Sequence, residues 1–587
     1  MKPVITRRRI VITMFVVLAL IALFVVRLVD IQVVRAAALN EQSSGKMSSP
    51  STVFGVRGDI TDRNGSILAQ AQMRYNVTAS PRNAKDFERT VEGKKVTVTP
   101  AQAAGEIGRI TGQFPNEIID ILNRALQENA ESDFVYITKG VELATYRALD
   151  ALDIPWLYFE SAPSRVYPNG AVAGNLIGYV GSDGKPLAGL EQSANECVGS
   201  TDGQQTYERG ADGIMIPGSN VVSKQAVNGG KLKLTIDADL QWYSQQVLAK
   251  QVKDQHGSWG IAVILEVKTG KLISVADYPS VDPNNVDGTA DRFRGSLAFS
   301  APYEPGSTMK SLTSGMLLDT GKASASSRVN APYEITFPNG ANFHDSGHHN
   351  ARLTLAGVMV ESSNVGLSKL SDSLSPRVRY DYMTKFGLGS ATNVNFLGES
   401  DGILRPWREW DNQTHYTTMF GQGFTATAVQ MASAYQAIGN GGVRIPVTLI
   451  DGCTKPNGDY VAAKSGDSVK VISPEAARGV VDMMENVASQ GWLRDKFKIP
   501  GYRVAAKTGT AQQSNGQGGY SKSYIVTIAG MVPAADPQYV ILTTIADARL
   551  NSTAAVAPVF HDLAVQVLKH YRIQPRTSGA SRLPLYY

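Results

Sequence analysis

Cysteine is nearly absent from this sequence: Cys197 and Cys453 are the two examples among 587 residues. They lie far apart and have no partnering histidine cluster, so they provide neither the spaced ligands of a zinc site nor the dense framework of a disulfide-rich domain. A single bridge between them remains possible, because spacing alone does not determine whether two distant cysteines pair.

A strong excess of one charge is missing as well. The formal net charge is +5, from 57 basic and 52 acidic residues, and no basic patch carries interleaved aromatic residues. The sequence therefore gives no support for nucleic acid as a partner. At this length the chain should contain two or more domains with large cores.

Long hydrophobic runs are scarce, and one stretch alone approaches membrane length. Residues 10–26 carry no charge and follow three arginines at positions 7–9. Such a run is just long enough to span a bilayer with snorkelling ends. By the positive-inside rule, the arginines place the N-terminus in the cytoplasm.

A cleaved signal peptide is the alternative, with the alanines at 36–38 as its cleavage site. However, Arg27 and Asp30 interrupt the apolar run before those alanines, and the run is long for a signal peptide. We therefore expect a cytoplasmic tail at 1–9 and an uncleaved single-pass anchor at 10–29. In either case the remaining chain lies outside the cytoplasm.

The rest of the chain divides into parts that differ in their expected secondary structure. Residues 30–230 are rich in strand and turn signals, with a helical interval near 100–130. The segment "VRGDITDRNGSILAQ" predicts two short strands about an Asp-Arg-Asn-Gly turn. In residues 231–571, strands and longer helices alternate, and "WGIAVILEVKTGKLISVADY" is typical of a hairpin. We expect residues 572–587, which contain Pro, Ser and Gly, to form a flexible tail that frays.

The segment "YEPGSTMKSLTSGMLLDTGK" places Ser307 after Pro-Gly and Lys310 three residues later. Apolar residues then recur near the helical period up to Gly321, so Ser307 should lie at a helix N-terminus, where backbone N–H groups stabilise negative charge. Lys310 would share its face and could act as a base if burial or a cation keeps it neutral. Ser43 and Lys46 have the same spacing, but in a polar linker where we expect them to be solvated.

Two further motifs follow in order. "MVESSNVGLSKL" contains Ser362 and Asn364, a hydroxyl and an amide two residues apart in a turn, and "YRVAAKTGTAQ" contains Lys-Thr-Gly-Thr at 507–510. The glycine there would let a substrate backbone approach the strand edge, and the lysine would lower the pKa of a neighbouring lysine. Each pattern also occurs elsewhere in the chain, so the order and context of the three carry the argument.

Ser-x-x-Lys, Ser-x-Asn and Lys-Thr-Gly in this order resemble the class B penicillin-binding proteins, closest to the division-specific FtsI type. The resemblance runs from the anchor to about residue 570 and includes "RGDITDRNGSILA", "RVYPNGAVAGNLIGYVG" and "FGQGFTATAVQMASAYQAIGNGG". It implies an α+β fold with one N-terminal transmembrane helix. A β-lactamase-like transpeptidase domain at 231–571, an antiparallel sheet flanked by helices, would stand on an elongated β-rich dimerisation or pedestal domain at 30–230.

The same resemblance implies a peptidoglycan D,D-transpeptidase that works through an acyl-enzyme. Ser307 would attack the carbonyl between the two terminal D-alanines of a stem peptide, and Lys310 would take its proton. Ser362 would relay a proton to the leaving amine, and the backbone N–H groups of Ser307 and Thr510 would form the oxyanion hole. Asn364 would hold either Lys310 or the substrate amide. The full set of residues implied to bind the substrate is Asn364, Lys507, Thr508, Gly509 and Thr510.

The resemblance implies no cofactor and no metal. The segment "NFHDSGHHN" gathers three histidines with Asp345, but it has neither a helical His-Glu-x-x-His nor a third separated ligand, so we interpret it as a polar loop near the site. The implied partners are peptidoglycan stem peptides, β-lactams as substrate mimics and, at the division septum, a SEDS-family lipid II polymerase with other division proteins.

Other functions remain open on the sequence. An elongation-type class B transpeptidase would share the motifs, although the Ser-Ser-Asn form of the second one is closer to division enzymes. A D,D-carboxypeptidase or a β-lactamase would pass the acyl group to water, and the large pedestal argues against a β-lactamase. A non-catalytic β-lactam sensor should have more membrane spans and a cytoplasmic output domain.

Overall fold

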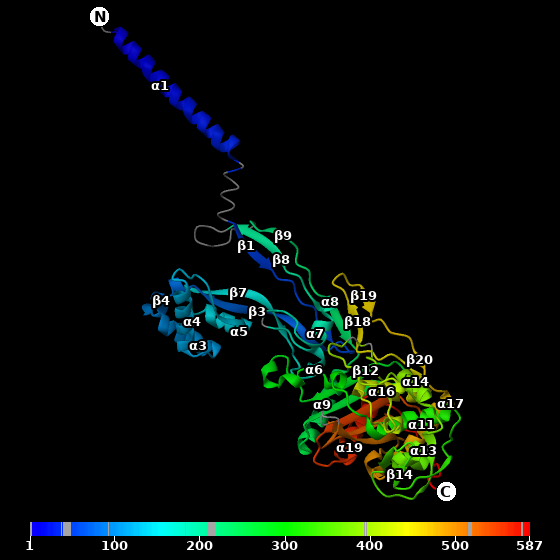
Figure 1. The fold of residues 1–587 in the computed structure, drawn as a ribbon. Helices are drawn as coiled ribbons and strands as arrows, with labels where there is room; N and C mark the ends of the chain where they lie inside the picture. The colour runs from blue at the N-terminus through cyan, green and yellow to red at the C-terminus, as the bar shows by residue number, and fades with distance from the viewer. Residues whose placement is uncertain are drawn as a thin grey trace. The chain divides into compact units, whose positions relative to one another are not determined.

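The computed structural model of the chain divides into two compact units (Figure 1). The described residues are 3–36, 38, 48–91, 93–181, 183–208, 219–392, 394, 396–514, 519–576 and 579–587. The first unit comprises Met1–Val56 and Ser200–Asn228, and the second comprises Arg57–Gly199 and Gly229–Tyr587. The Ser43 and Lys46 pair lies outside the described residues.

The first unit contains the expected apolar helix. Its elements are α1 (Pro3–Val29), the π-helical turn η1 (Asp30–Val34), and the antiparallel strands β1 (Ser48–Val53), β8 (Gly203–Glu208) and β9 (Val221–Lys224). Within the span Arg7–Val34, the most apolar 18-residue window has a mean hydropathy of 2.9, and none of that window is buried. A helix that is apolar all round and packs against no protein is compatible with a single-pass membrane anchor.

The second unit begins with the predicted hairpin. Strands β2 (Ile60–Thr61) and β3 (Ile67–Ala79) pair antiparallel. The Asp62 carboxylate closes their turn, because its Oδ1 accepts the backbone N–H groups of Asn64 at 2.8 Å and Ser66 at 2.7 Å. Aspartate side chains stabilise turns in this way, which is why the Asp-Arg-Asn-Gly signal identified the hairpin.

Beyond the hairpin, β3 supports a small helical layer. It pairs with β6 (Val135–Val141) and β7 (Leu157–Val166), and the expected helical interval forms two helices, α3 (Pro100–Thr111) and α4 (Pro115–Glu128). The break falls at Gly112, where φ is +81°, a conformation that glycine adopts without strain. The other elements before β10 are β4 (Phe87–Val91), β5 (Lys94–Val98), α5 (Leu143–Asp150), α6 (Gly174–Ile177), α7 (Gly189–Ser193) and α8 (Asn195–Val198).

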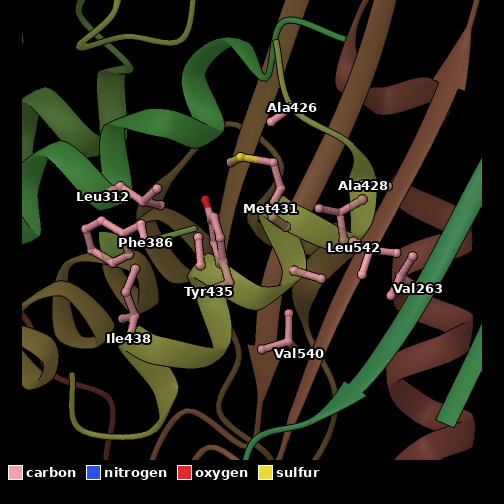
Figure 2. Packing of buried hydrophobic residues seen from close by; sticks show 14 of the residues in the cluster. Val263, Leu312, Phe386, Ala426, Ala428, Met431, Tyr435, Ile438, Val540 and Leu542 are labelled. Carbon is pink, nitrogen blue, oxygen red and sulfur yellow. The ribbon is translucent and has the colours of Figure 1, made fainter. Parts of the chain in front are cut away.

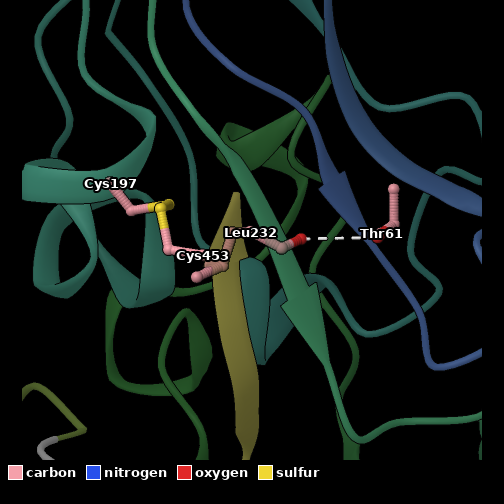
Figure 3. Close-up of a disulfide and its surroundings, with 4 residues drawn as sticks. All are labelled: Thr61, Cys197, Leu232 and Cys453. Atoms are coloured by element: carbon pink, nitrogen blue, oxygen red, sulfur yellow. Dashed lines mark hydrogen bonds between the residues drawn. A yellow bond between two sulfur atoms is a disulfide. The ribbon is translucent and has the colours of Figure 1, made fainter. Parts of the chain in front are cut away.

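Three strands from distant parts of the sequence lie side by side near the predicted boundary at Lys231 (Figure 3). Strand β10 (Lys231–Leu234) runs parallel to β2 on one side and antiparallel to β18 (Ile450–Thr454) on the other, and β18 also pairs with β19 (Tyr460–Ala462). Because β10 bonds to strands of both segments, the boundary at Lys231 stays a prediction.

A disulfide joins the two cysteines at this sheet. Cys197 on α8 is bonded to Cys453 on β18, with 6.1 Å between the Cα atoms and a sequence separation of 256 (Figure 3). The question that the sequence left open is thus answered: the pair is bonded. The bond links the segment before β10 covalently to the segment after it.

We expect Cys197→Ser with Cys453→Ser to lower the free energy of unfolding of the chain without its N-terminal apolar helix by about 2–5 kcal/mol, because the bond closes a long loop and restricts the unfolded chain. Urea unfolding of both forms, with and without reductant, measures the change. Reductant should weaken the wild type and leave the double variant unaffected, since the chain has no other cysteine. Equal stability of the wild type and the double variant in the absence of reductant would contradict the prediction.

The main sheet of the second unit confirms the predicted fold class. Its five strands are antiparallel throughout. In spatial order they are β12 (Leu272–Tyr278), β11 (Trp259–Glu266), β23 (Tyr539–Ala546), β22 (Tyr520–Val532) and β21 (Ala505–Ser514). The first two form the hairpin that the sequence predicts.

Helices cover both faces of this sheet because its strands are apolar on both faces. Along β11, Ile261 and Val263 belong to one hydrophobic cluster, whereas the alternating Ala262 and Ile264 belong to another, as a period of two requires. The first cluster packs against α11 (Met309–Asp319), α16 (Ala428–Gly439) and α17 (Pro474–Gln490) (Figure 2). The second packs against α9 (Ala238–Asp254) and α19 (Ala557–His570), which lie side by side (Figure 1).

Short elements surround these layers. They are α10 (Leu297–Ser300), β13 (Arg328–Asn330), β14 (Glu334–Thr336), β15 (Asn342–His344), β16 (Arg352–Thr354), α12 (Leu355–Glu361), α13 (Asn364–Ser371), α14 (Pro376–Lys385), α15 (Thr414–Thr417), β17 (Val443–Arg444), β20 (Val469–Lys470) and α18 (Arg494–Phe497).

The C-terminal tail does not fray as expected. Among its described residues, the Leu585 carbonyl accepts the backbone N–H of Thr354 at 2.9 Å, and the Tyr586 hydroxyl donates to Glu361. Gly357 makes room for the tail, since a Cβ there would lie 2.0 Å from the Leu585 oxygen. Composition indicated a loose end, but the final Leu-Pro-Leu-Tyr-Tyr supplies side chains that pack beside α12, so the prediction is wrong for these last residues.

Candidate active site

Ser307 lies in a tight turn at the start of a helix. The turn is η5 (Gly306–Thr308), a 3₁₀ turn that continues directly into α11. Its glycine has φ +55°, and a Cβ on Gly306 would lie 2.7 Å from the Thr510 carbonyl oxygen. Ser307 is half-buried in this turn, and Lys310 follows on the first turn of α11.

Gly421 and Tyr435, which lie outside the three motifs, form hydrogen bonds with this turn. The Gly306 N–H donates to the Gly421 carbonyl at 2.9 Å, and a Cβ at Gly421 would lie 1.9 Å from the Gly306 oxygen. Tyr435 on α16 donates its hydroxyl to the Thr308 carbonyl at 2.8 Å, and its ring is buried among apolar side chains (Figure 2). Both lie in the segment "FGQGFTATAVQMASAYQAIGNGG", but a glycine and a tyrosine without a chemical motif gave no sequence signal of this contact.

Lys310 is completely buried. Its Nζ donates to the backbone carbonyl of Ser362 and to the Ser362 hydroxyl, the latter at 3.2 Å. Among the described residues, no hydrogen bond joins Lys310 to Ser307, as is common for catalytic pairs without substrate. Burial lowers the pKa of Lys310 to about 7, and the negative charge of Asp345 opposes this effect. A large fraction of this amine is therefore neutral near pH 7 and able to accept a proton.

Ser362 is the point where the three motifs meet. It ends α12 in the left-handed conformation, with φ +57°. Besides the bond from Lys310, its Oγ receives a hydrogen bond from Lys507 Nζ at 2.9 Å. Lys507 is buried, and burial followed by the charge of Lys310 lowers its pKa well below the usual range. Two ammonium groups so close cannot both stay protonated without cost.

The Lys-Thr-Gly-Thr segment lies on β21, which stands at the edge of the five-stranded sheet and, among the described strands, pairs with β22. Thr508 is half-buried and Thr510 is exposed. A Cβ on Gly509 would lie 2.9 Å from Thr308 Cγ2 and 3.0 Å from the Pro305 oxygen. The turn that carries Ser307 thus makes the close approach that requires glycine at position 509. The sequence interpretation had assigned that close approach to a substrate backbone.

Among the described residues, no hydrogen bond joins Asn364 to Lys310. Its Nδ2 donates to the His344 carbonyl at 3.1 Å, so the loop "NFHDSGHHN" lies beside the second motif. Among the described residues, no group of three or more His, Cys, Asp or Glu side chains is placed to hold a metal ion. The Asp345 carboxylate accepts the backbone N–H of Val365, next to Asn364, at 3.0 Å. The sequence interpretation missed this contact because it has no local signature.

Known families match both parts of the chain. Residues 260–564 match the penicillin binding protein transpeptidase domain, and residues 52–234 match the penicillin-binding protein dimerisation domain. These segments include the three motifs and the paired strands β2, β3 and β10 described above.

Named relatives match over almost the whole chain. Penicillin-binding protein PbpB of Mycobacterium tuberculosis is 34% identical, over 94% of this chain and 83% of the relative. Peptidoglycan D,D-transpeptidase FtsI of Escherichia coli is 29% identical, over 95% of this chain and 91% of the relative. A crystal structure of penicillin binding protein 3 from M. tuberculosis, complexed with ampicillin, has a TM-score of 0.70 and 28% identity, covering 92% of this chain and 100% of that one.

Proposed function

Because the chain belongs to the penicillin-binding proteins that combine a transpeptidase domain with a dimerisation domain, we propose that it is a division-type peptidoglycan D,D-transpeptidase with Ser307 as its nucleophile. The observation that carries the site assignment is the convergence of Lys310 and Lys507 on the Ser362 hydroxyl. A buried lysine with a pKa of about 7 has the property that a base for serine requires.

The first half-reaction forms an ester. Ser307 Oγ bonds to the carbonyl carbon of the penultimate D-alanine, while Lys310 accepts the hydroxyl proton. The peptide bond to the terminal D-alanine then breaks, and the leaving amine takes a proton through Ser362. Backbone N–H groups of Ser307 and Thr510 would hold the oxyanion.

The second half-reaction transfers the acyl group. The amine of a neighbouring stem peptide attacks the ester carbon, a new peptide bond forms, the ester bond breaks, and the amine proton returns to Ser307. Lys507, Thr508 and Thr510 on β21 would bind the terminal carboxylate of the donor, with Asn364 at the substrate amide. β-Lactams would acylate Ser307 as mimics of D-Ala-D-Ala.

The partition of the acyl group tests this function. The purified extracytoplasmic part, given a stem-peptide donor ending in D-Ala-D-Ala and an acceptor amine, should release D-alanine and form cross-linked product in amounts that rise with the acceptor concentration. Mass spectrometry of the products measures the ratio. Release of D-alanine with hydrolysed donor as the sole product at every acceptor concentration would instead identify a D,D-carboxypeptidase.

The proposal extends to location and partner. The arginines at 7–9 support a cytoplasmic N-terminus, and the Ser-Ser-Asn motif supports a role at the division septum. An enzyme that only cross-links needs fresh glycan strands, and coupling to a membrane-embedded SEDS-family lipid II polymerase raises the effective concentration of donor and acceptor peptides. The anchor and the membrane-adjacent part of the pedestal would form the docking surface.

Exchanging residues 1–35 for an unrelated single-pass anchor should weaken septal recruitment or polymerase stimulation, because the native helix would contribute to docking. Fluorescence microscopy and glycan-polymerisation assays measure the two effects. Depletion of the protein should give filaments or chains of cells with unfinished septa. Rounded cells on depletion would favour the elongation role, and a fully functional anchor swap would remove the anchor from the docking surface.

A further inference from the structure

The carboxylate of Asp345 is buried against the start of α13. Asp345 is 1% exposed, and both of its oxygens are bonded. Oδ2 accepts the Ser363 hydroxyl at 2.6 Å and lies 2.7 Å from His349 Nε2. Oδ1 accepts the backbone N–H of Val365 at 3.0 Å and that of Asn364. A single side chain from the loop after β15 thus binds three consecutive residues that follow Ser362.

These bonds matter because Ser362 has an unfavourable backbone conformation. A non-glycine residue in the left-handed region is strained and persists where its surroundings hold it. On one side of Ser362 lies α12, and the Val358 carbonyl in this helix accepts the backbone N–H of Ser362. On the other side, the Asp345 carboxylate supplies charge-assisted bonds to the N-terminus of α13, where the helix dipole also favours a negative charge.

The geometry points to Asp345 as a positioning residue of the active site, which fixes the Ser362 hydroxyl and carbonyl between Lys310 and Lys507 by anchoring the turn at 362–365. This inference rests on the proposed function, in which Ser362 relays a proton. It also gives the histidine-rich loop a role: His349 orients the carboxylate, and the loop supports the second motif from outside.

Asp345 acts on Lys310 in a second way. Its negative charge stabilises the protonated amine and works against the effect of burial. Among the described residues, the titratable groups around this centre are Lys310, Lys507 and Asp345, with His349 on the far side of the carboxylate and the charge of Glu361 acting on His349. Loss of the Asp345 charge should therefore lower the pKa of Lys310, in addition to loosening Ser362.

The chain provides a matched control in Asp237. That residue is also buried, also caps a helix, with Leu240 N–H donating to its Oδ1 at 3.2 Å, and also faces a histidine, with His570 Nε2 at 2.9 Å from its Oδ2. It is the N-cap of α9, whose buried Leu240 and Leu248 pack on the opposite face of the main sheet from α11. Asp237→Asn thus removes an equivalent charged cap away from the serine turn.

The test is the rate constant for acylation by a fluorescent penicillin, measured between about pH 5.5 and 9, the range in which a lysine with this pKa titrates. Asp345→Asn should lower the high-pH plateau by about 10- to 100-fold, as misplacement of a catalytic group does, and should move the acid limb to lower pH. Ser363→Ala, which keeps the carboxylate, should lower the plateau by a few-fold and leave the limb in place. Asp237→Asn should change neither.

Each outcome decides between the alternatives. A wild-type plateau and limb in Asp345→Asn, with Ser307 still labelled, would overturn the inference and leave the proposed function standing. If Asp345→Asn does not fold, a wild-type plateau in Ser363→Ala would overturn it. A loss of rate in Asp237→Asn equal to that in Asp345→Asn would reduce Asp345 to a structural cap. Absence of any label on wild-type Ser307 would instead contradict the proposed function.

Discussion

Ser307→Ala should abolish covalent labelling by penicillin and stop both D-alanine release and cross-linking, with a loss of about three orders of magnitude or more, as removal of a serine nucleophile does in other acyl-transfer enzymes. The turn at Gly306–Thr308 presents this hydroxyl at the start of α11. Gel fluorescence with a labelled penicillin measures the loss, and peptide mapping of the wild type locates the label.

The control for this prediction is Ser43→Ala. Ser43 precedes Lys46 by the same three residues as Ser307 precedes Lys310, so it tests whether spacing alone creates reactivity. Ser43→Ala should be labelled at the wild-type rate. A mapped label on Ser43 or Ser362 would contradict the assignment of Ser307 as nucleophile, whatever the effect of Ser307→Ala.

The features that could be predicted from the sequence are those with a local cause. The β11–β12 hairpin follows from two apolar strands around a Lys-Thr-Gly-Lys turn, and the helix after Ser307 follows from apolar spacing that ends before Gly321, where φ is +65°. The antiparallel sheet with helices on both faces entered through the family resemblance and not through periodicity, and no strand order was predicted.

The features that could not be predicted depend on partners far away in the chain. The disulfide forms because β10 lies between β2 and β18, which brings together cysteines 256 residues apart. The tail packs because Gly357 leaves room for it, and no local pattern at the C-terminus contains that information. Composition gave the wrong result there for this reason.

The candidate site shows the same division. The motifs indicated Ser307, Lys310, Ser362 and Lys507 as candidates, because serine–lysine chemistry requires those residue types. They did not reveal that Lys310 and Lys507 both bind the Ser362 hydroxyl, since burial and convergence are properties of the folded chain. The groups that hold the motifs in place, among them Asp345, carry no signature that chemistry alone would select.

Lys310→Ala should abolish acylation by penicillin while the protein stays folded, because the serine proton then has no acceptor beside the turn. The wild-type rate should rise with pH through about 7, the pKa to which burial lowers Lys310. The sign follows from the role: a base must be neutral, so acylation is slow below that pKa, where the amine is protonated, and reaches a plateau above it. Stopped-flow acylation of the wild type over this pH range measures the limb.

Lys310→Arg and Lys310→Met separate the base from the charge and the volume of the side chain. The guanidinium keeps the positive charge but stays protonated at every accessible pH, so Lys310→Arg should be inactive across the whole profile. Methionine keeps most of the buried volume without an amine, and Lys310→Met should be equally inactive with an intact fold by circular dichroism. Both results are required of a neutral-amine base. Acylation of Lys310→Met within about tenfold of the wild type, a range that general-base loss normally exceeds, would show that another group takes the proton, and Lys507, the second amine bonded to Ser362, would become the group to replace next.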